Sequence, residues 1–489
     1  MVKSKYLKYT LIIVTILSIF RLILLQLFNL VPQEAYYWLY IQRPALSYFD
    51  HPPICSYTIG LFTLIFGKNE FGVRFGMVLY SIGTIFFIYK LSQKFFNDDK
   101  SAFLTIIFLN LTIFFNLQSI ISTPDSPLLF FWAGAMYFYF KAIFETGKWR
   151  YWLLGGLFAG IGLASKYTSI FIFFNLILYF IISKNWKKIF SIKFICSIII
   201  ALFAFSPVII WNFQNGFASF LFQTSNRAKG VKSIGFNYLL QLIASQTYEL
   251  TPIFLILLIV IFIKSIQKFR YLELKELYLL IFTYPITIFF FLVSLTSLVK
   301  MNWIMPAYLS LMILSVKYFE KSNVKIQNRI KYLGLPISIV LIIINIIIII
   351  FPFMTIQKGD TWTGWKELAN RIISLKEKAD INNNNFIFSN EYKIPAELSF
   401  YTPYKNVILA ENVYGKPALQ FDYWFNVKKF KGWDGFFIFS DFNSSFNIED
   451  IKKFFKKVEF IEEMKIIKNN KIFRRFYIYH CVSYNPEAK

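Results

Sequence analysis

Long apolar segments recur along most of this chain, and they constrain its fold more than any other feature. A hydrocarbon core about 30 Å thick needs about 20 apolar residues per helix. The chain is 56% hydrophobic with a mean hydropathy of +0.51, outside the usual range of soluble domains. We expect eleven membrane-spanning helices, near residues 10–30, 72–90, 101–119, 126–144, 151–165, 167–183, 194–211, 251–267, 276–298, 302–317 and 332–353.

Basic residues are unevenly distributed over the loops between these segments. Because lysine and arginine mark the cytoplasmic side, their pattern predicts a cytoplasmic N-terminus and an extracytoplasmic C-terminal region. The first apolar run follows Lys3, Lys5 and Lys8 and is too long for a signal-peptide core, so we expect an uncleaved first span. With this orientation the outer loops hold only Arg43, Lys68, Arg74, Lys166, Arg227, Lys229, Lys232 and Lys300.

The composition changes near residue 354, where alternating and amphipathic patterns replace the apolar runs. Of the 27 acidic residues, 16 lie beyond this point. We therefore predict a transmembrane domain over residues 1–353 and a small extracytoplasmic α/β domain over 354–489. The expected elements are an interfacial helix at 54–66, helices at 365–378 and 448–455, strands at 385–388, 407–409 and 435–439, and a hairpin of 458–467 with 472–480.

The charge and cysteine counts exclude several functions. The net charge is +25, but most basic residues lie in short loops between apolar spans, so we expect no nucleic-acid partner. Three cysteines without a close pair and two histidines give neither a disulfide framework nor a His/Cys metal site.

Acidic and aromatic residues are concentrated in the loop after the first span. Residues 33–38 read Gln-Glu-Ala-Tyr-Tyr-Trp, and residues 48–53 read Tyr-Phe-Asp-His-Pro-Pro. A connecting loop needs turn formers but not this set of side chains, which suits a polar, charged ligand at the lipid–water boundary. The membrane part contains eleven acids, of which five are expected on the outer side: Glu34, Asp50, Glu70, Asp125 and Glu249.

Together with Thr123-Pro124-Asp125 and Ser165-Lys166-Tyr167, these motifs resemble the GT-C membrane glycosyltransferases. The closest branch is the family 39-like one, containing protein O-mannosyltransferases and bacterial lipid A aminoarabinose transferases. Weaker matches follow in the same order at residues 302–308, 396–401 and 420–424. The resemblance implies a polytopic helical GT-C fold and the bacterial inner membrane. It also implies inverting transfer of a monosaccharide from a polyprenyl-phosphate donor to a lipid, glycan or protein acceptor at the outer face.

Such a transfer needs a carboxylate that accepts the acceptor's proton. The resembling families carry an acidic pair after the first span, but here its first position is Gln33, with Glu34 beside it. Glutamine cannot abstract a proton, so either Glu34, Asp50 or Asp125 is the base, or the protein is an inactive relative. Each acid could instead have a purely structural role. Glu34 and Asp125 would then be acids at helix N-termini, and Asp50 would be a turn residue.

The lipid phosphate that leaves the sugar in such a reaction gains negative charge, so cations are expected near it. The resemblance implies that Lys166, beside Tyr167, contacts the phosphate, and Arg227 could clamp it through two hydrogen bonds. His51 is a further candidate, either as a phosphate donor or as a divalent-metal ligand with Asp50; no cofactor is otherwise expected. A surface lysine can also simply reach out of the bilayer. Gln33, Tyr36 and Tyr37 complete the predicted substrate site.

The rival function is a lipid-linked sugar transporter. Transporters often carry inverted repeats and charges near the bilayer midplane. This chain shows no detectable repeat, and its candidate residues lie in the outer loops, so the sequence favours an enzyme.

Overall fold

The computed structural model describes residues 5–226, 235–351, 362–378, 384–441 and 447–487. Its contacts divide the chain into two compact units. The first contains Met1–Ile23, His51–Thr58 and Arg74–Ile346, and the second contains Leu24–Asp50, Ile59–Val73 and Ile347–Lys489.

This division differs from the single boundary that the sequence predicted near residue 353. Two N-terminal segments are grouped with the C-terminal residues because aromatic side chains hold them there. For example, the Tyr36 and Phe421 rings stack at 6.1 Å between centroids. The first loop is therefore part of the second unit.

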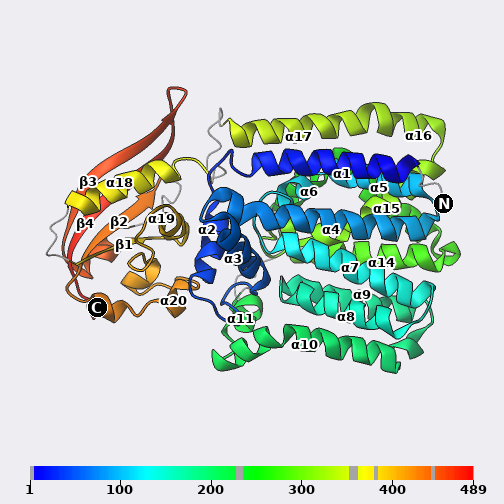
Figure 1. Ribbon diagram of the computed structural model, residues 1–489, viewed down its shortest axis with the longest axis horizontal. Coiled ribbons are helices and arrows are strands. Elements are labelled where there is room, and N and C mark those ends of the chain that lie inside the picture. The colour runs from blue at the N-terminus through cyan, green and yellow to red at the C-terminus, as the bar shows by residue number, and fades with distance from the viewer. Residues whose placement is uncertain (1–4, 227–234, 352–361, 379–383, 442–446, 488–489) are drawn as a thin grey trace. The chain divides into compact units, whose positions relative to one another are not determined.

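The first unit is a bundle of helices, most of which run along a common direction (Figure 1). The helices of the membrane part are α1 (Lys5–Leu24), α3 (Ile54–Phe66), α4 (Glu70–Phe96), α5 (Asp99–Asn110), α6 (Ile113–Gln118), α7 (Asp125–Phe144), α8 (Trp149–Leu163), α9 (Phe171–Ile182), α10 (Ile192–Gln214), α11 (Ala218–Leu221), α12 (Asn237–Leu250), α13 (Pro252–Gln267), α14 (Leu274–Val293), α15 (Met305–Lys321), α16 (Val324–Arg329) and α17 (Leu335–Ile350).

Every one of the eleven predicted spans contains a helix, and the polytopic helical fold class is confirmed. Within the described residues, six helices are long and apolar enough to cross a membrane, and α12 with α13 would make a seventh. The predicted spans at 101–119, 151–165, 167–183 and 302–317 form shorter helices, and the first of these is divided between α5 and α6. The predicted helix at 54–66 is present as α3.

Glycines allow two helices of the bundle to approach closely. A Cβ atom on Gly156 would lie 2.1 Å from the carbonyl oxygen of Ser197, and one on Gly160 would lie 2.4 Å from that of Ala201. Both glycines are on α8, four residues apart, and both contacts are on α10. Small residues at this spacing let helix backbones pack against each other in membranes. This packing fixes α8, whose C-terminal end leads to Lys166.

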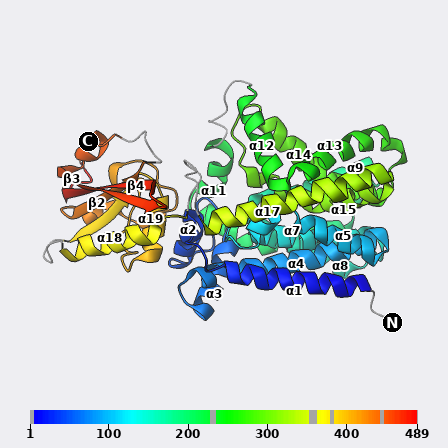
Figure 2. The same cartoon turned by 90° about the horizontal axis from the view of Figure 1, so that it is seen from above.

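The helices α12 and α13 meet at a sharp bend of 112° (Figure 2). Pro252 has no N–H group to continue the preceding helix, and Thr251 has a positive φ of 65°. The Thr251 hydroxyl is hydrogen-bonded to Ser338 Oγ at 2.7 Å, which ties the bend to α17. Glu249, two residues before the bend, is held in the interior as a result.

The second unit contains a four-stranded sheet of β1 (Asn385–Ser389), β2 (Asp434–Ser440), β3 (Phe455–Lys468) and β4 (Lys471–Tyr484). The strand order is β1-β2-β4-β3, with β1 parallel to β2 and the other pairs antiparallel. The predicted strand at 407–409 forms only one bridge, between Ile387 and Ile408. The predicted helix at 448–455 is shorter than expected: it is α21 (Glu449–Lys452), and β3 begins at Phe455. The smaller helices of the unit are α2 (Pro32–Ile41), α18 (Trp365–Lys378), α19 (Lys393–Tyr401) and α20 (Phe421–Trp424).

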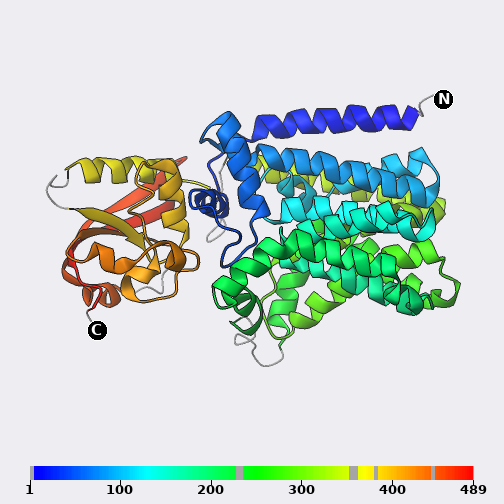
Figure 3. The same cartoon turned by 60° about the horizontal axis from the view of Figure 1, so that its bottom comes forward.

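Alternating residues of the sheet fill two cores, one on each face. Ile387 and Ile438 pack with Leu368 of α18 and Leu398 of α19. Their sequence neighbours, such as Phe388, point to the opposite face, where they pack with residues of the 409–430 segment. Figure 3 shows α18 on one side of the strands and this segment on the other. The period of two that predicted the strands therefore also builds both cores.

Candidate active site

A buried polar cluster lies at one end of the helical bundle, and we call it the Asp125 cluster. It consists of Asp125, Lys166, Glu249 and Asn302. Each comes from a helix end: Asp125 begins α7, Lys166 follows α8, Glu249 is near the end of α12, and Asn302 is in the short helix Met301–Trp303 before α15. Asp125 and Glu249 are each 1% exposed. Four segments that are distant in sequence are thus brought to one place.

Asp125 is held through both of its carboxylate oxygens. Lys166 donates from Nζ to Oδ1 at 2.7 Å, and Asn302 donates from Nδ2 to Oδ2 at 2.6 Å. Charge-assisted hydrogen bonds of this length are among the stronger ones in proteins. The Lys166 side chain therefore does not reach into solvent: it is 6% exposed and paired with an acid.

Glu249 brings a second carboxyl group close enough to Asp125 and Lys166 to interact with their charges. The charges of Asp125 and Lys166 both act on it, and its Oε2 atom has no hydrogen-bond partner among the described residues. Gln246, one turn earlier on α12, donates to the Met301 carbonyl at 3.1 Å. This bond links α12 to the segment that carries Asn302. The cluster thus combines two carboxylates with one ammonium.

The other end of the bundle is basic. Lys141 lies in the last turn of α7, which Asp125 begins, and Lys317 and Lys321 lie at the far end of α15. The acids of the cluster and these lysines therefore lie at opposite ends of the same helices.

Glu34 is completely buried and caps its own helix. Its Oε2 atom accepts the backbone N–H of Val31 at 3.0 Å, at the start of α2. An acid in the first turn also interacts favourably with the helix dipole. Gln33, next to it, is half-buried.

Asp50 is bound by two tyrosines of α2. Tyr36 donates its hydroxyl to Oδ1 at 3.1 Å, and Tyr40 donates to the same oxygen. Burial, followed by the charge of Asp50, raises the pKa of both phenols well above the usual value, so both remain donors. The Tyr36 hydroxyl accepts the N–H of Gln420 at 3.0 Å, and Gln420 Oε1 accepts the N–H of Phe49 at 2.6 Å.

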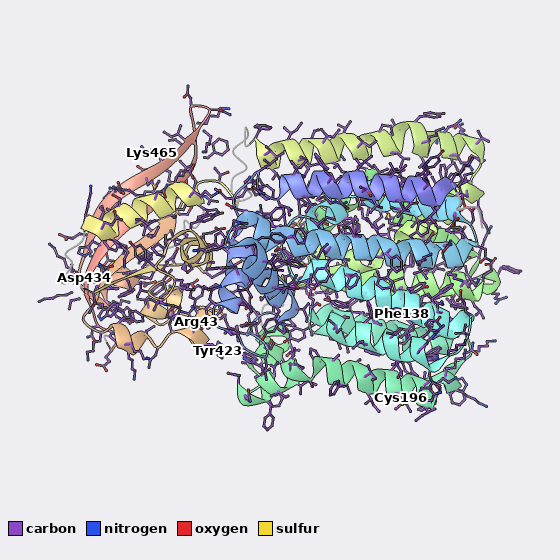
Figure 4. All side chains as sticks on the ribbon, viewed as in Figure 1. Arg43, Phe138, Cys196, Tyr423, Asp434 and Lys465 are labelled. Atoms are coloured by element: carbon purple, nitrogen blue, oxygen red, sulfur yellow. The ribbon has the colours of Figure 1, made fainter. Side chains whose placement is uncertain are left out.

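The predicted loop motif and the predicted motif at 420–424 thus pack against each other within the second unit. The Arg43 guanidinium adds to this contact by lying 4.5 Å from the Phe425 ring centroid and 5.5 Å from that of Trp424. Figure 4 shows Arg43 close to Tyr423 of α20. Aromatic and cation–π contacts account for much of the composition of the loop.

The remaining predicted residues are placed as follows. Tyr37 is buried in α2, and His51 is half-buried directly after Asp50. The Tyr167 hydroxyl is hydrogen-bonded to Ser219 Oγ at 2.7 Å. Arg227 lies outside the described residues. Among the residues that are described, no group of three or more His, Cys, Asp or Glu side chains could hold a metal ion.

Comparison with known structures decides the fold. The crystal structure of ArnT from Cupriavidus metallidurans bound to undecaprenyl phosphate matches 97% of this chain and 98% of that chain, with a TM-score of 0.66 and 12% sequence identity. The chain has a GT-C glycosyltransferase fold. An oligosaccharyltransferase of Archaeoglobus fulgidus shares the GT-C arrangement over 82% of this chain and 64% of its own, with a TM-score of 0.51 and 12% identity.

Sequence comparison finds similarity over shorter stretches of the chain. The family model described as dolichyl-phosphate-mannose-protein mannosyltransferase matches residues 50–211, which contain Asp50, Asp125 and Lys166. The undecaprenyl phosphate-alpha-4-amino-4-deoxy-L-arabinose arabinosyl transferase of Serratia proteamaculans is 30% identical over 134 residues, 26% of this chain and 24% of its own length. An uncharacterized protein of Aquifex aeolicus is 26% identical over 104 residues, 21% of each chain. The chain thus matches about a quarter or less of these relatives' length. The predicted resemblance is confirmed.

Sequence reasoning did not assign Glu249 and Asn302 to the site of this GT-C fold. The sequence places Glu249 only among the five outer acids and Asn302 only within the motif at 302–308. The available signal was weak: Glu249 is the first acid after Glu145, at the end of an amphipathic stretch that precedes Pro252. Its approach to Asp125 depends on the bend at Thr251, which the sequence did not predict.

Proposed function

We propose that this protein is a glycosyltransferase that moves a monosaccharide from a polyprenyl-phosphate donor to a lipid, glycan or protein acceptor. The proposal is supported by the likeness to ArnT, whose structure holds undecaprenyl phosphate, and by the relatives named for an undecaprenyl-phosphate sugar. The observation that carries it is the buried contact between Lys166 and Asp125. This contact joins a cation that can stabilise the departing phosphate and a carboxylate that can accept the acceptor's proton.

The proposed reaction is a single displacement. An acceptor oxygen attacks the anomeric carbon while the bond between that carbon and the phosphate oxygen breaks, so the configuration inverts. The acceptor's proton passes to a carboxylate, and the negative charge of the departing lipid phosphate is stabilised by Lys166. No metal or cofactor is needed to balance this step.

Asp125 is the proposed proton acceptor. In the structure Lys166 occupies its Oδ1 atom, and a donor phosphate would compete for the same ammonium and free this oxygen. Asn302 keeps the other oxygen in place at 2.6 Å. Glu34 and Asp50 have structural hydrogen bonds instead, which favours supporting roles for them.

The Asp125 cluster is proposed to face the outer side of a bacterial plasma membrane. The lysines at the opposite helix ends support this orientation, because basic residues mark the cytoplasmic side. The C-terminal sheet would then be extracytoplasmic. A donor whose prenyl chain stays in the lipid can present its sugar phosphate at such a boundary.

A transfer assay with purified protein tests the function. Radiolabelled polyprenyl-phosphate sugars would be supplied one at a time, with a membrane extract as acceptor, and labelled product measured. Wild-type protein should transfer at least one sugar, and Asp125→Asn should not. The absence of transfer from every donor would contradict the proposal.

A second candidate function rests on Gln33, because the family resemblance implies an aspartate at this position. In this case the protein binds the lipid donor but does not catalyse transfer. The same assay separates the two candidate functions. If the protein only binds the donor, the wild-type protein is inactive and Gln33→Asp restores activity.

A further inference from the structure

A cavity of about 380 Å³ lies between α13, α14 and α15, at the ends of α13 and α15 that are distant from the Asp125 cluster. Its size lies within the range of about 300–1,000 Å³ that ligand pockets usually have. Four lysines line it: Lys264 in the last turn of α13, Lys268 directly after this helix, and Lys317 and Lys321 at the end of α15. In each pair the lysines are four residues apart, so both members lie on the same face of their helix.

Only one of these lysines is neutralised. Lys317 donates to Glu276 Oε2 at 2.7 Å, whereas the other three make no ion pair among the described residues. The Lys264 ammonium lies 4.6 Å from the Tyr318 ring centroid. With Glu273 also at the lining, the cavity carries an excess of positive charge.

Two general effects place lysines at such positions. Cations are favoured at helix C-termini, and basic residues are retained on the cytoplasmic side of membrane proteins. Both effects are satisfied by lysines that point into solvent anywhere in the loop. Neither effect requires lysine pairs at the ends of two different helices to line the same cavity. We take this convergence of four ammonium groups as the sign of an anionic ligand.

We propose that this cavity binds the phosphate-bearing headgroup of an anionic phospholipid. The ammonium groups would surround the phosphate, and the apolar lining residues Ile261, Leu272 and Leu314 would contact the glycerol and the first acyl carbons. Tyr271, at the edge, is 87% exposed and belongs to the residue types that gather at membrane interfaces. Basic pockets between membrane helices are suited to such headgroups.

Native mass spectrometry of the full-length protein in detergent tests the site. The protein would be incubated with phosphatidylglycerol or with phosphatidylcholine of the same acyl chains. Wild-type protein should retain phosphatidylglycerol preferentially. The double variant Lys268→Gln/Lys321→Gln should bind it about 30-fold more weakly, from about 1 kcal/mol per lysine at an anionic surface. The double variant Lys268→Arg/Lys321→Arg should retain binding.

Lys187→Gln/Lys188→Gln is the matched control, because it removes the same charge from a segment, Trp186–Phe190, that does not line the cavity. It should bind phosphatidylglycerol as wild type does. Inorganic phosphate, added at millimolar concentration, should not displace the lipid. The proposal is overturned if both glutamine variants lose binding equally, if the two lipids bind equally, or if inorganic phosphate alone displaces the lipid completely.

Discussion

The Nζ atom of Lys166 lies 2.7 Å from Oδ1 of Asp125, in an ion pair that is almost fully buried. Because both charged groups are largely removed from water, each depends on the other. Removing one member of a buried pair leaves an uncompensated charge and costs about 3–5 kcal/mol, whereas replacing both is often nearly neutral. Stability and activity can therefore be separated by mutation.

Lys166→Met alone should lower the free energy of unfolding by about 3–5 kcal/mol. The double variant Lys166→Met/Asp125→Asn should regain part of this loss, since both members of the pair are removed and Glu249 is the one acid left in the Asp125 cluster, yet it should remain inactive in transfer. Unfolding in detergent measures the stability of each variant, and the transfer assay on the same samples measures its activity. An active double variant would show that the pair is only structural.

The glycines of α8 give a second prediction. Gly160→Leu would force side-chain atoms against the Ala201 carbonyl, which a Cβ atom alone would meet at 2.4 Å. Overpacking of this kind costs about 1–3 kcal/mol, and it should also displace Lys166 and reduce transfer. Leu157→Ile, on the exposed side of the same helix, should change neither the midpoint of thermal unfolding nor the transfer rate.

The proposed orientation predicts that Lys300 and Lys325 lie on opposite sides of the membrane. Each would be replaced by cysteine in a background without Cys196, the one native cysteine that is not buried. A membrane-impermeant thiol reagent added to intact cells should label the variant at position 300 only. Labelling of position 325 from outside would reverse the topology.

The second unit should become less stable as the pH rises from about 5 to 7. Burial, with the nearby charges of Glu391 and Asp422, raises the pKa of Glu411 from 4.5 to about 7. The folded state therefore binds more protons than the unfolded state in this window, and stability falls with increasing pH. The midpoint temperature of thermal unfolding should depend less on pH for Glu411→Gln than for wild type. An unchanged slope would mean that Glu411 is ionised in the folded protein.

Much of the fold was predictable because it depends on local periodicity. Apolar runs predicted a helix in every expected span, and alternation predicted β1, β2 and the hairpin of β3 and β4. The packing of the first loop against the C-terminal residues was not predictable. The N–H of Gln420 meets the Tyr36 hydroxyl across 384 positions in the sequence, and no local pattern contains such a pair.

The candidate site was predicted in part. Their motifs point to Asp125 and Lys166, and the structure brings these two residues into contact. No motif points to Glu249, because its place depends on the positive φ of Thr251 and the bend of 112° between α12 and α13. For Glu34 the sequence leaves two roles open, a proton acceptor or an acid at a helix N-terminus, and in the structure its carboxylate caps α2.

The most direct test of the central claim is transfer from a polyprenyl-phosphate sugar by wild type, Lys166→Ala and Lys187→Ala, compared in a single-turnover experiment. Lys187 is an exposed lysine outside the Asp125 cluster and serves as the control. Loss of a group that stabilises developing negative charge typically slows a reaction by about 100- to 1,000-fold. We expect this loss for Lys166→Ala and wild-type rates for Lys187→Ala. Equal rates for all three proteins would contradict the assignment of the Asp125 cluster as the active site.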